Sequence, residues 1–460
     1  MPRRKLWLPV LALVSCASPR PVEAPGSPPS PPSAAPSASA EPKPEVAPGS
    51  EANAVVAEAL MVVTRRRELA AKGPVKGKTI SRPEMVAFVK RELQNEVPAP
   101  VIAAQNEMLF ALGVVGESFD YEKSLLELMG SQLAGFYDPK EKSMFLARDL
   151  PPMERDATLA HELVHALQDQ HYDLEARIKF REDAGDEQSA IHALAEGDAT
   201  SAMLDHVLSA RGLRAIDVSE DVIALEARGS MELSMEAANV PSILKRSVIS
   251  PYIDGLIFVN WARRRGGWAQ VDAIWKDLPT TTEQLLHPEK LLAREKAETL
   301  PLPKPRSGWP SELMYRDVQG EQSLRLLFEE WMPRRAAAEG ASAWSGDRVA
   351  VFRSGQRFAL AWHVRYDTEA AARTGLESFA RGVLRPEGSS EFVDPALVTR
   401  QTKGQRLCSE RATRGPFAVV RSGRDLGVVA GPFERSAGGA KSQGSCTDAL
   451  VWATSVAKQR

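Results

Sequence analysis

The sequence has few histidines, cysteines and aromatic side chains, and almost no net charge. Its 58 basic and 60 acidic residues leave a formal charge of −2, which is unlike the basic balance of a nucleic-acid-binding chain, and no RNA- or DNA-binding motif is present. The apolar run Leu6 to Val14 is too short to span a bilayer. A hydrophobic content of 43% is nevertheless ample for folded cores, and 460 residues favour two or three folded units.

The first fifteen residues are typical of an export signal. Three basic residues, Arg3 to Lys5, precede the apolar run. The quartet Leu13-Val14-Ser15-Cys16 resembles a bacterial lipobox, which implies cleavage before Cys16 and lipidation of its thiol. An ordinary secretory signal with an incidental cysteine is the alternative. Ala17 follows the cysteine, and by resemblance to the sorting rule of enteric bacteria this favours the outer membrane of the cell envelope.

The rest of the chain divides by composition. Residues 16–50 are rich in proline, alanine and serine and predict an extended tether. Residues 51–312 predict a mainly helical domain with a short β-hairpin, and a proline-rich stretch at 296–312 predicts a linker. Residues 317–460 predict a smaller α+β domain, so the fold class expected for the chain is α+β.

Hydrophobic periodicity and turn residues predict the individual elements. Helices are expected at 52–73, 81–95, 98–114, 121–132, 156–170, 186–210, 217–246, 250–265, 267–278, 320–338, 367–384 and from 446. Strands are expected at 135–139, 143–147, 348–353, 357–365, 405–410, 416–421 and 425–430.

Two cysteines remain after Cys16, at positions 408 and 446. Because an exported chain enters an oxidising compartment, we expect Cys408 and Cys446 to form a disulfide. Two separate buried thiols are the alternative, since the sequence gives no distance between them.

The most informative motif is His161-Glu162-Leu163-Val164-His165. Residues four apart lie on one face of a helix, so both imidazoles can bind one metal ion, and Glu162 can take a proton from a water bound to it. Asp156 is the expected N-cap of this helix. With only seven histidines, composition alone would produce the motif in roughly one such chain in a hundred. The alternative is a buried helix with two satisfied histidines.

Two histidines need a third protein ligand to form a catalytic zinc site. The expected ligand is Glu196, because it lies 31 residues past His165, far enough for its helix to return across the first helix. Gly197 would allow another backbone to approach, and Asp198 could orient a ligand imidazole. His192, one turn before Glu196, is the alternative ligand.

His171 is not an expected ligand. It lies six residues past His165, at the wrong angle on a continuous helix. It is also too near for the longer arrangement His-Glu-x-x-His-x-x-Gly-x-x-His, whose glycine position is occupied by Gln168.

These residues resemble a group of bacterial zincin-like proteins of the gluzincin type. The resemblance rests on the segments 161–174 and 196–199 (Glu-Gly-Asp-Ala), and further on 135–139 and 282–288. It implies Zn²⁺ held by His161, His165 and Glu196, with Glu162 as general base. The chain departs from thermolysin in its longer gap to the glutamate and in lacking the Asn/Ser-Glu signature, so substrate preference does not transfer.

The sequence thus predicts a lipid-anchored zinc metallopeptidase that hydrolyses peptide bonds. His287, and after it Tyr252, are the expected donors to the oxygen on which charge develops. A strand at 134–138 or 143–147 would present an edge to an extended peptide. The expected partners are a peptide or protein substrate and, through lipidated Cys16, the membrane. A catalytically silent binding or scaffold lipoprotein, and a zinc hydrolase of a non-peptide amide, are the alternatives.

Overall fold

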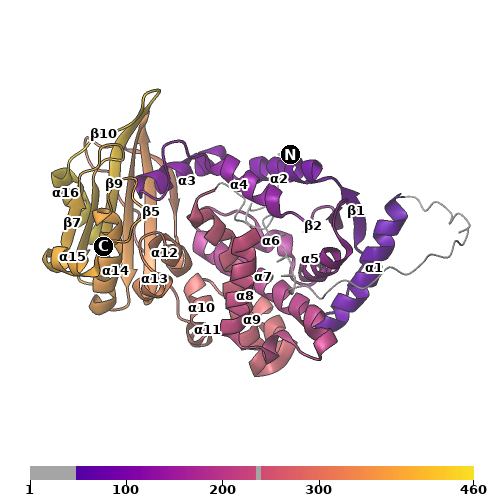
Figure 1. The fold of residues 1–460 in the computed structure, drawn as a ribbon. Coiled ribbons are helices and arrows are strands. Elements are labelled where there is room, and N and C mark those ends of the chain that lie inside the picture. Colours follow the sequence, from indigo (N-terminus) through magenta and orange to yellow (C-terminus); the bar gives the residue numbers. More distant parts are fainter. Residues whose placement is uncertain (1–47, 235–239) are drawn as a thin grey trace, which may run out of the picture.

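The computed structural model of the chain describes residues 48–234 and 240–460 (Figure 1). The expected signal segment, Cys16 and most of the tether lie outside the described residues. The described fold is α+β, as predicted. Helices, drawn from indigo to magenta, make up most of one part, and a large sheet in orange and yellow forms the other.

The helical part contains one small sheet. Its strand order is β1–β3–β2, from β1 (Lys76–Ile80), β3 (Ser143–Ala147) and β2 (Gly135–Asp138). β1 runs parallel to β3, whereas β2 pairs with β3 as an antiparallel hairpin. The sequence predicts the hairpin but not β1. The segment KGKTI has too little apolar alternation to identify it, and pairing with β3 holds it as a strand.

Long helices form the centre of this part. They are α5 (Pro152–Tyr172), α7 (Gly185–Leu208) and α9 (Ser242–Lys276). Two non-helical glycines, Gly266 and Gly267, kink α9 at the boundary that the sequence predicts between two helices. Around the centre lie α1 (Pro48–Arg67), α2 (Arg82–Glu96), α3 (Ala99–Ala111), α4 (Tyr121–Gln132), α6 (Leu174–Ile178), α8 (Glu220–Ser234), α10 (Thr282–Leu286) and α11 (Pro288–Ala293), with 3-10 turns at Ser209–Arg211 and Ala215–Asp217.

The helix that carries the histidine pair begins earlier than expected. Asp156 was predicted as its N-cap, but α5 starts at Pro152, four residues before it, and has no side-chain cap. Proline suits the first turn of a helix because N–H groups there have no acceptor within the helix, so a residue without an N–H loses no hydrogen bond. Asp156 instead accepts a hydrogen bond from His206 Nε2 at 2.8 Å. The helix ends at Tyr172, and the residue that follows, Asp173, has a left-handed backbone conformation with a φ of 56°.

Helices α7 and α9 cross at two glycines. A Cβ on Gly197 would lie 2.0 Å from the carbonyl carbon of Gly255, and a Cβ on Gly255 would lie 1.8 Å from the carbonyl oxygen of Ala193. Both positions therefore need hydrogen in place of a side chain. The expectation that Gly197 allows a second backbone to approach beside Glu196 is confirmed.

The C-terminal part is built on an antiparallel sheet of order β4–β5–β6–β9–β8–β7, with β10 paired to β9. The strands are β4 (Glu312–Asp317), β5 (Trp344–Ser354), β6 (Arg357–Tyr366), β7 (Arg406–Ser409), β8 (Phe417–Ser422), β9 (Asp425–Ser436) and β10 (Gly439–Ser442). The helices are α12 (Gly320–Phe328), α13 (Arg334–Ala341), α14 (Glu369–Leu384), α15 (Pro395–Gln401) and α16 (Cys446–Ala457), with a 3-10 turn at Thr402–Gly404. The sequence does not predict β4 or β10, and the strand that it predicts at 425–430 is shorter than β9.

The sheet has a different core on each face. On β6, the larger side chains Leu360, Trp362 and Val364 pack with α12, α13 and α14. The alternate positions Ala359 and Ala361 pack with α16. This alternation has the period of two expected of a strand covered on both faces, with small residues where the helix lies closest.

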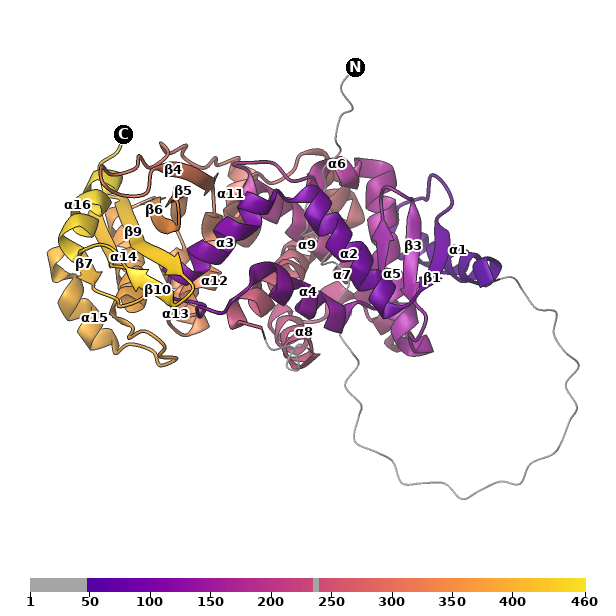
Figure 2. The same cartoon turned by 90° about the horizontal axis from the view of Figure 1, so that it is seen from above.

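Helix α3 joins the two parts. It lies in the first half of the chain, yet Met108, Phe110 and Leu112 at its end belong to the core of the C-terminal sheet. Figures 1 and 2 both show α3 reaching the sheet. The division at residues 312–317 therefore separates the two parts along the chain but not in their packing.

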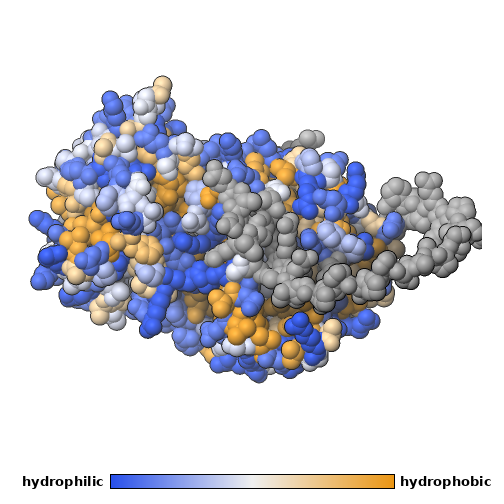
Figure 3. Space-filling model, viewed as in Figure 1, coloured by the Kyte–Doolittle hydropathy of each residue, from blue (hydrophilic) through white to orange (hydrophobic). Residues whose placement is uncertain are grey.

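Cys408 and Cys446 form a disulfide between β7 and α16, with Cα atoms 5.7 Å apart, which confirms the expected pairing. None of the helices within 48–234 and 240–460 has the length and apolar character needed to cross a membrane. On the face seen in Figure 3, hydrophilic residues surround scattered apolar patches.

Candidate metal centre

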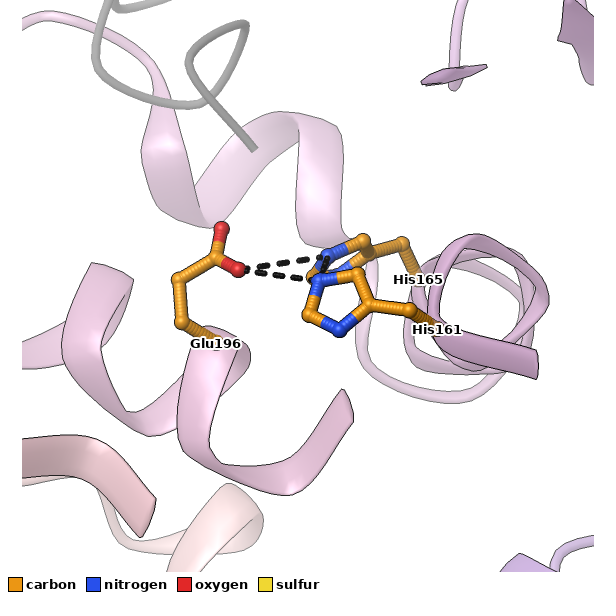
Figure 4. A group of neighbouring side chains, drawn as sticks. All are labelled: His161, His165 and Glu196. Atoms are coloured by element: carbon orange, nitrogen blue, oxygen red, sulfur yellow. Dashed lines mark hydrogen bonds and ion pairs between the residues drawn. The ribbon is translucent and has the colours of Figure 1, made fainter. Parts of the chain in front are cut away.

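Helices α5 and α7 bring two histidines and a glutamate together. His161 and His165 stand one turn apart on α5, and Glu196 points at them from α7 (Figure 4). All three side chains are almost fully buried, with exposures of 3%, 5% and 1%. The structure thus places the three expected ligands in one group.

The spacing of the three ligand atoms fits a small tetrahedral ion. His161 Nε2 lies 3.2 Å from His165 Nε2 and 3.1 Å from Glu196 Oε2, and His165 Nε2 lies 3.7 Å from Glu196 Oε2. Zinc–ligand bonds of about 2.0–2.1 Å at tetrahedral angles separate the ligand atoms by roughly 3.3 Å. The nitrogen and oxygen donors are also those that zinc prefers.

The charges of the group favour a cation at its centre. Burial alone would raise the pKa of Glu196, but the charge of His165 and hydrogen bonds from His161, His165 and His192 hold it well below its ordinary value. Burial lowers and Glu196 raises the pKa of His165, with a net rise to about 9. Burial also lowers the pKa of His161. A carboxylate facing buried imidazoles is stabilised by positive charge, which a proton or a metal ion can supply.

Gln168 orients one of the imidazoles. Its Oε1 accepts a hydrogen bond of 2.9 Å from His165 Nδ1, which leaves the Nε2 lone pair directed at the group. Its Nε2 donates at 3.0 Å to the carbonyl of Ala195, next to Glu196. The sequence did not identify this role. The sequence pattern that could have indicated it is the spacing of three residues between His165 and Gln168, which places both on the same face of the helix.

His192 contacts the other oxygen of the same carboxylate. Its Nε2 lies 3.2 Å from Glu196 Oε1, while Oε2 faces the histidine pair. His192, the alternative third ligand, therefore lies outside the three-residue group and contacts the carboxylate oxygen that faces away from the histidine pair.

Glu162 lies beside the pair, where a general base is expected. Its side chain is 1% exposed, and its Oε2 accepts a hydrogen bond of 3.1 Å from the backbone N–H of Tyr137 in β2. That strand is at the edge of its sheet, because the strand order is β1–β3–β2. The sequence did not identify the contact with Tyr137, which depends on how the hairpin packs on α5.

The two expected charge-stabilising residues lie in different places. Tyr252 of α9 stacks on His161, with ring centroids 5.7 Å apart. His287, the first choice, follows α10, and its Nε2 lies 2.9 Å from Glu321 Oε1 of α12. Its described contacts join α10 to α12 and none reaches the three-residue group, so Tyr252 rather than His287 is adjacent to the histidines.

Asp198 does not orient an imidazole, contrary to the sequence-based expectation. It pairs with the buried guanidinium of Arg67 from α1 and accepts a hydrogen bond of 2.9 Å from Trp275 Nε1. Asp198 points away from α5 toward α1 and α9, and it joins these helices to α7. His171, excluded as a ligand by its spacing, lies 2.6 Å from the carbonyl oxygen of Ala70.

A second group of acidic residues has a different explanation. Glu283, Glu295 and Asp367 are close enough together to hold an ion. However, Lys290 Nζ donates to all three, at 2.6, 2.6 and 2.9 Å. The ammonium supplies the positive charge there, and the cluster is an ion-pair network.

A family match lies within the C-terminal part. The family described as "Domain of unknown function (DUF8575)" matches residues 312–440, from β4 into β10. That match covers less than half of the chain and includes neither α5 nor α7. No curated protein and no solved structure matches the chain. Function therefore has to be inferred from the geometry of the three-residue group.

Proposed function

We propose that the chain is a zinc-dependent peptidase with a zincin-like catalytic part, carried on a lipid-anchored envelope protein. The observation that carries the proposal is the buried Glu162, which follows His161 on α5 and lies close enough to His165 for its charge to raise the pKa of that imidazole. A purely structural zinc site has no use for a buried carboxylate adjoining three ligands of this kind. The spacing of the three ligand atoms supports zinc as the ion.

The side chains have separate roles in this proposal. His161, His165 and Glu196 would hold a zinc ion, which would supply Lewis acidity there. Glu162 takes the proton of the attacking water and passes it to the leaving amine. Tyr252 replaces His287 as the candidate donor to the carbonyl oxygen, because it stacks on His161.

The hairpin brings an edge strand, whose residues are buried, next to Glu162. β2 is an edge strand in its sheet, and its Tyr137 N–H already binds Glu162. An extended peptide lying along β2 would pass the catalytic carboxylate. This arrangement supports peptide-bond hydrolysis over attack on a compact non-peptide amide.

We further propose that lipidated Cys16 and the proline-rich tether hold the folded part at the outer membrane. The disulfide between Cys408 and Cys446 supports an oxidising compartment outside the cytoplasm, because such bonds rarely persist in reducing cytosol. Loss of radiolabelled palmitate incorporation in Cys16→Ser is the expected result.

One paired experiment tests the catalytic proposal. We expect wild type and Glu162→Gln each to contain one zinc per chain by mass spectrometry. Only the wild type should cleave an internally quenched peptide library, with the variant slower by about 10²–10⁴-fold because proton transfer is lost. Glu154→Gln is the matched control, since Glu154 lies on the same helix in its first turn and should leave cleavage unchanged.

Three results would count against the proposal. A wild type without zinc, or a Glu162→Gln variant that cleaves as fast as wild type, contradicts peptide hydrolysis at this site. Zinc binding without any cleavage favours the silent scaffold. Unchanged zinc content in Glu196→Ala would show that a residue other than Glu196 is the third ligand.

A further inference from the structure

A cavity of two adjoining lobes lies between the helical part and the C-terminal part. The larger lobe has a volume of about 220 Å³ and the smaller about 140 Å³. The lobes share walls formed by α7, α9 and β4, including His192, Ser247 and Tyr315. The two lobes therefore adjoin at these shared residues.

The cavity adjoins the metal centre through His192. This residue lines both lobes, and its Nε2 lies 3.2 Å from Glu196 Oε1. Helix α7 forms the cavity wall from Gly185 to His192, a distance of about 10 Å at 1.5 Å per residue. A ligand in the cavity would therefore contact His192, the residue that separates it from the carboxylate of Glu196.

The walls of both lobes are mainly apolar. Met108, Leu109 and Leu112 line the larger lobe, and residues of α2, α3 and α4 such as Leu93, Ile102 and Leu125 line the smaller one. An apolar cavity of about 150 Å³ accommodates benzene. Each lobe therefore has room for about one side chain the size of leucine or phenylalanine.

No lysine or arginine of the described ranges lines either lobe. The buried carboxylate of Asp317 at the wall is engaged by the N–H of Gly185 at 2.9 Å and the hydroxyl of Tyr315 at 2.7 Å. Phosphate or carboxylate groups would find no lysine or arginine of the described ranges to pair with there. The chemistry of the walls selects neutral, apolar groups.

The C-terminal part supplies one wall of this cavity. Leu326 and Leu327 of α12 and Trp362 of β6 face the larger lobe. Helix α12 is fixed against α9, because Arg325 forms a buried ion pair with Asp254 and Gln322 Nε2 donates to the same carboxylate at 2.7 Å. The wall is therefore held in place by both parts of the chain.

We infer that this cavity binds two bulky apolar side chains of a peptide substrate, and that the C-terminal sheet domain determines this specificity. The inference rests on the proposed peptidase function and adds the substrate class, a peptide with neighbouring leucine- or phenylalanine-like residues. It also gives the C-terminal part a role: it forms the wall opposite α7 without contributing a catalytic group.

Binding to a catalytically impaired full-length chain tests the inference. We would measure the affinity of Glu162→Gln for fluorescein-labelled Gly-Ala-Leu-Phe-Leu-Ala-Gly, and for the same peptide with serines in place of the three central residues. We expect the apolar peptide to bind at least tenfold more tightly. Adding Ser323→Phe, which fills the larger lobe from α12, should weaken its binding about tenfold or more.

Ser342→Phe is the matched control. Ser342 is a half-buried serine of the same part, at the end of α13, and does not line the cavity. It should leave binding unchanged. Circular dichroism and thermal melting establish that each variant folds. Should Ser323→Phe fail to fold, Ser247→Phe fills the region shared by both lobes from α9.

Failure of the inference and failure of the peptidase proposal give different results. Equal affinity for the two peptides, or no effect of the folded cavity-filling variants, overturns the inference. Wild type that cleaves both peptides equally overturns it too and leaves the peptidase proposal standing. Tight binding of the apolar peptide without cleavage by wild type supports the cavity assignment and contradicts peptide hydrolysis.

Discussion

Gln168 connects the two helices of the candidate metal centre through one side-chain amide. Its Oε1 accepts a hydrogen bond from His165 Nδ1 and its Nε2 donates to the carbonyl of Ala195, so it holds the imidazole of α5 in register with the carboxylate of α7. Hydrogen bonds of this kind restrict a ligand to one tautomer and one orientation, and they increase its basicity. The ligand geometry therefore depends on a residue that binds no metal itself.

Replacing Gln168 by leucine tests this dependence. The substitution keeps a similar volume but removes both hydrogen bonds, so we expect zinc affinity to fall about 10- to 100-fold, measured by competition with a chromogenic chelator. Gln170→Leu is the control. Gln170 lies on the same helix and hydrogen-bonds to Lys72 and Gly73, away from the histidines. Equal affinity in both variants would contradict an orienting role for Gln168.

Packing of α7 on α9 determines where Glu196 lies. The two helix backbones touch at Gly197 and Gly255, and Glu196 directly precedes the first of these glycines. Any side chain at this crossing would push α7 away from α9 and move Glu196 relative to α5. The position of the third ligand is thus a property of a helix pair.

We expect Gly197→Ala to destabilise the chain by about 3 kcal/mol or more, because the new methyl group would meet backbone atoms that cannot rotate away. Thermal and urea unfolding measure this, and zinc content should fall with it. Gly229→Ala is the matched control. Gly229 lies within α8 with nothing within 4 Å of an added Cβ, so alanine should stabilise the chain by up to about 1 kcal/mol. A Gly197→Ala variant with the unfolding free energy of wild type would contradict the close contact between α7 and α9.

At the scale of the whole molecule, buried polar residues hold the two parts together. Asp186 in the first turn of α7 accepts hydrogen bonds from the N–H and hydroxyl of Thr282 in α10. A Cβ on Gly320 of α12 would clash with the same carboxylate, so α12 lies directly against it. Asp186 therefore lies where α7, α10 and the C-terminal part meet.

This junction should make stability depend on pH. Burial raises the pKa of Asp186 to about 8, from a value near 4 in the unfolded chain. The folded chain therefore binds the proton more tightly, and this contribution to stability is present below about pH 4 and is lost as the pH rises through about 8. We expect Asp186→Asn to remove a slope of up to about 1.4 kcal/mol per pH unit from the free energy of unfolding between these values.

Urea unfolding at several pH values measures that slope. Asp221→Asn is the control, because Asp221 also lies in the first turn of a helix, α8, but is exposed. Its slope should equal that of wild type. An unchanged or steeper slope in Asp186→Asn would show that this carboxyl is not held protonated in the folded chain.

Local patterns in the sequence predicted much of the helix that carries the histidine pair, and of its surroundings. The spacing of His161 and His165 places both on one face of any α-helix, and the turn after Asp138 predicts the β2–β3 hairpin. The larger strands of the C-terminal sheet, the glycine break in α9 and the pairing of Cys408 with Cys446 were also predicted. These features depend on residues close in sequence or on a small choice of partners.

Other features were decided only by tertiary packing. Strand β1 exists because β3 pairs with it, and α3 belongs to the C-terminal core because its apolar end meets the sheet. Gln168 has its role because the carbonyl of Ala195 lies within its reach, and Asp198 has its role because it faces the guanidinium of Arg67. The cavity exists because of the way α12 packs on α9. The sequence by itself determined the residue types and local periodicity that bring two histidines and Glu162 to one helix. Only the tertiary structure decided what faces them, because contacts between distant segments depend on how helices cross, which local propensity does not encode.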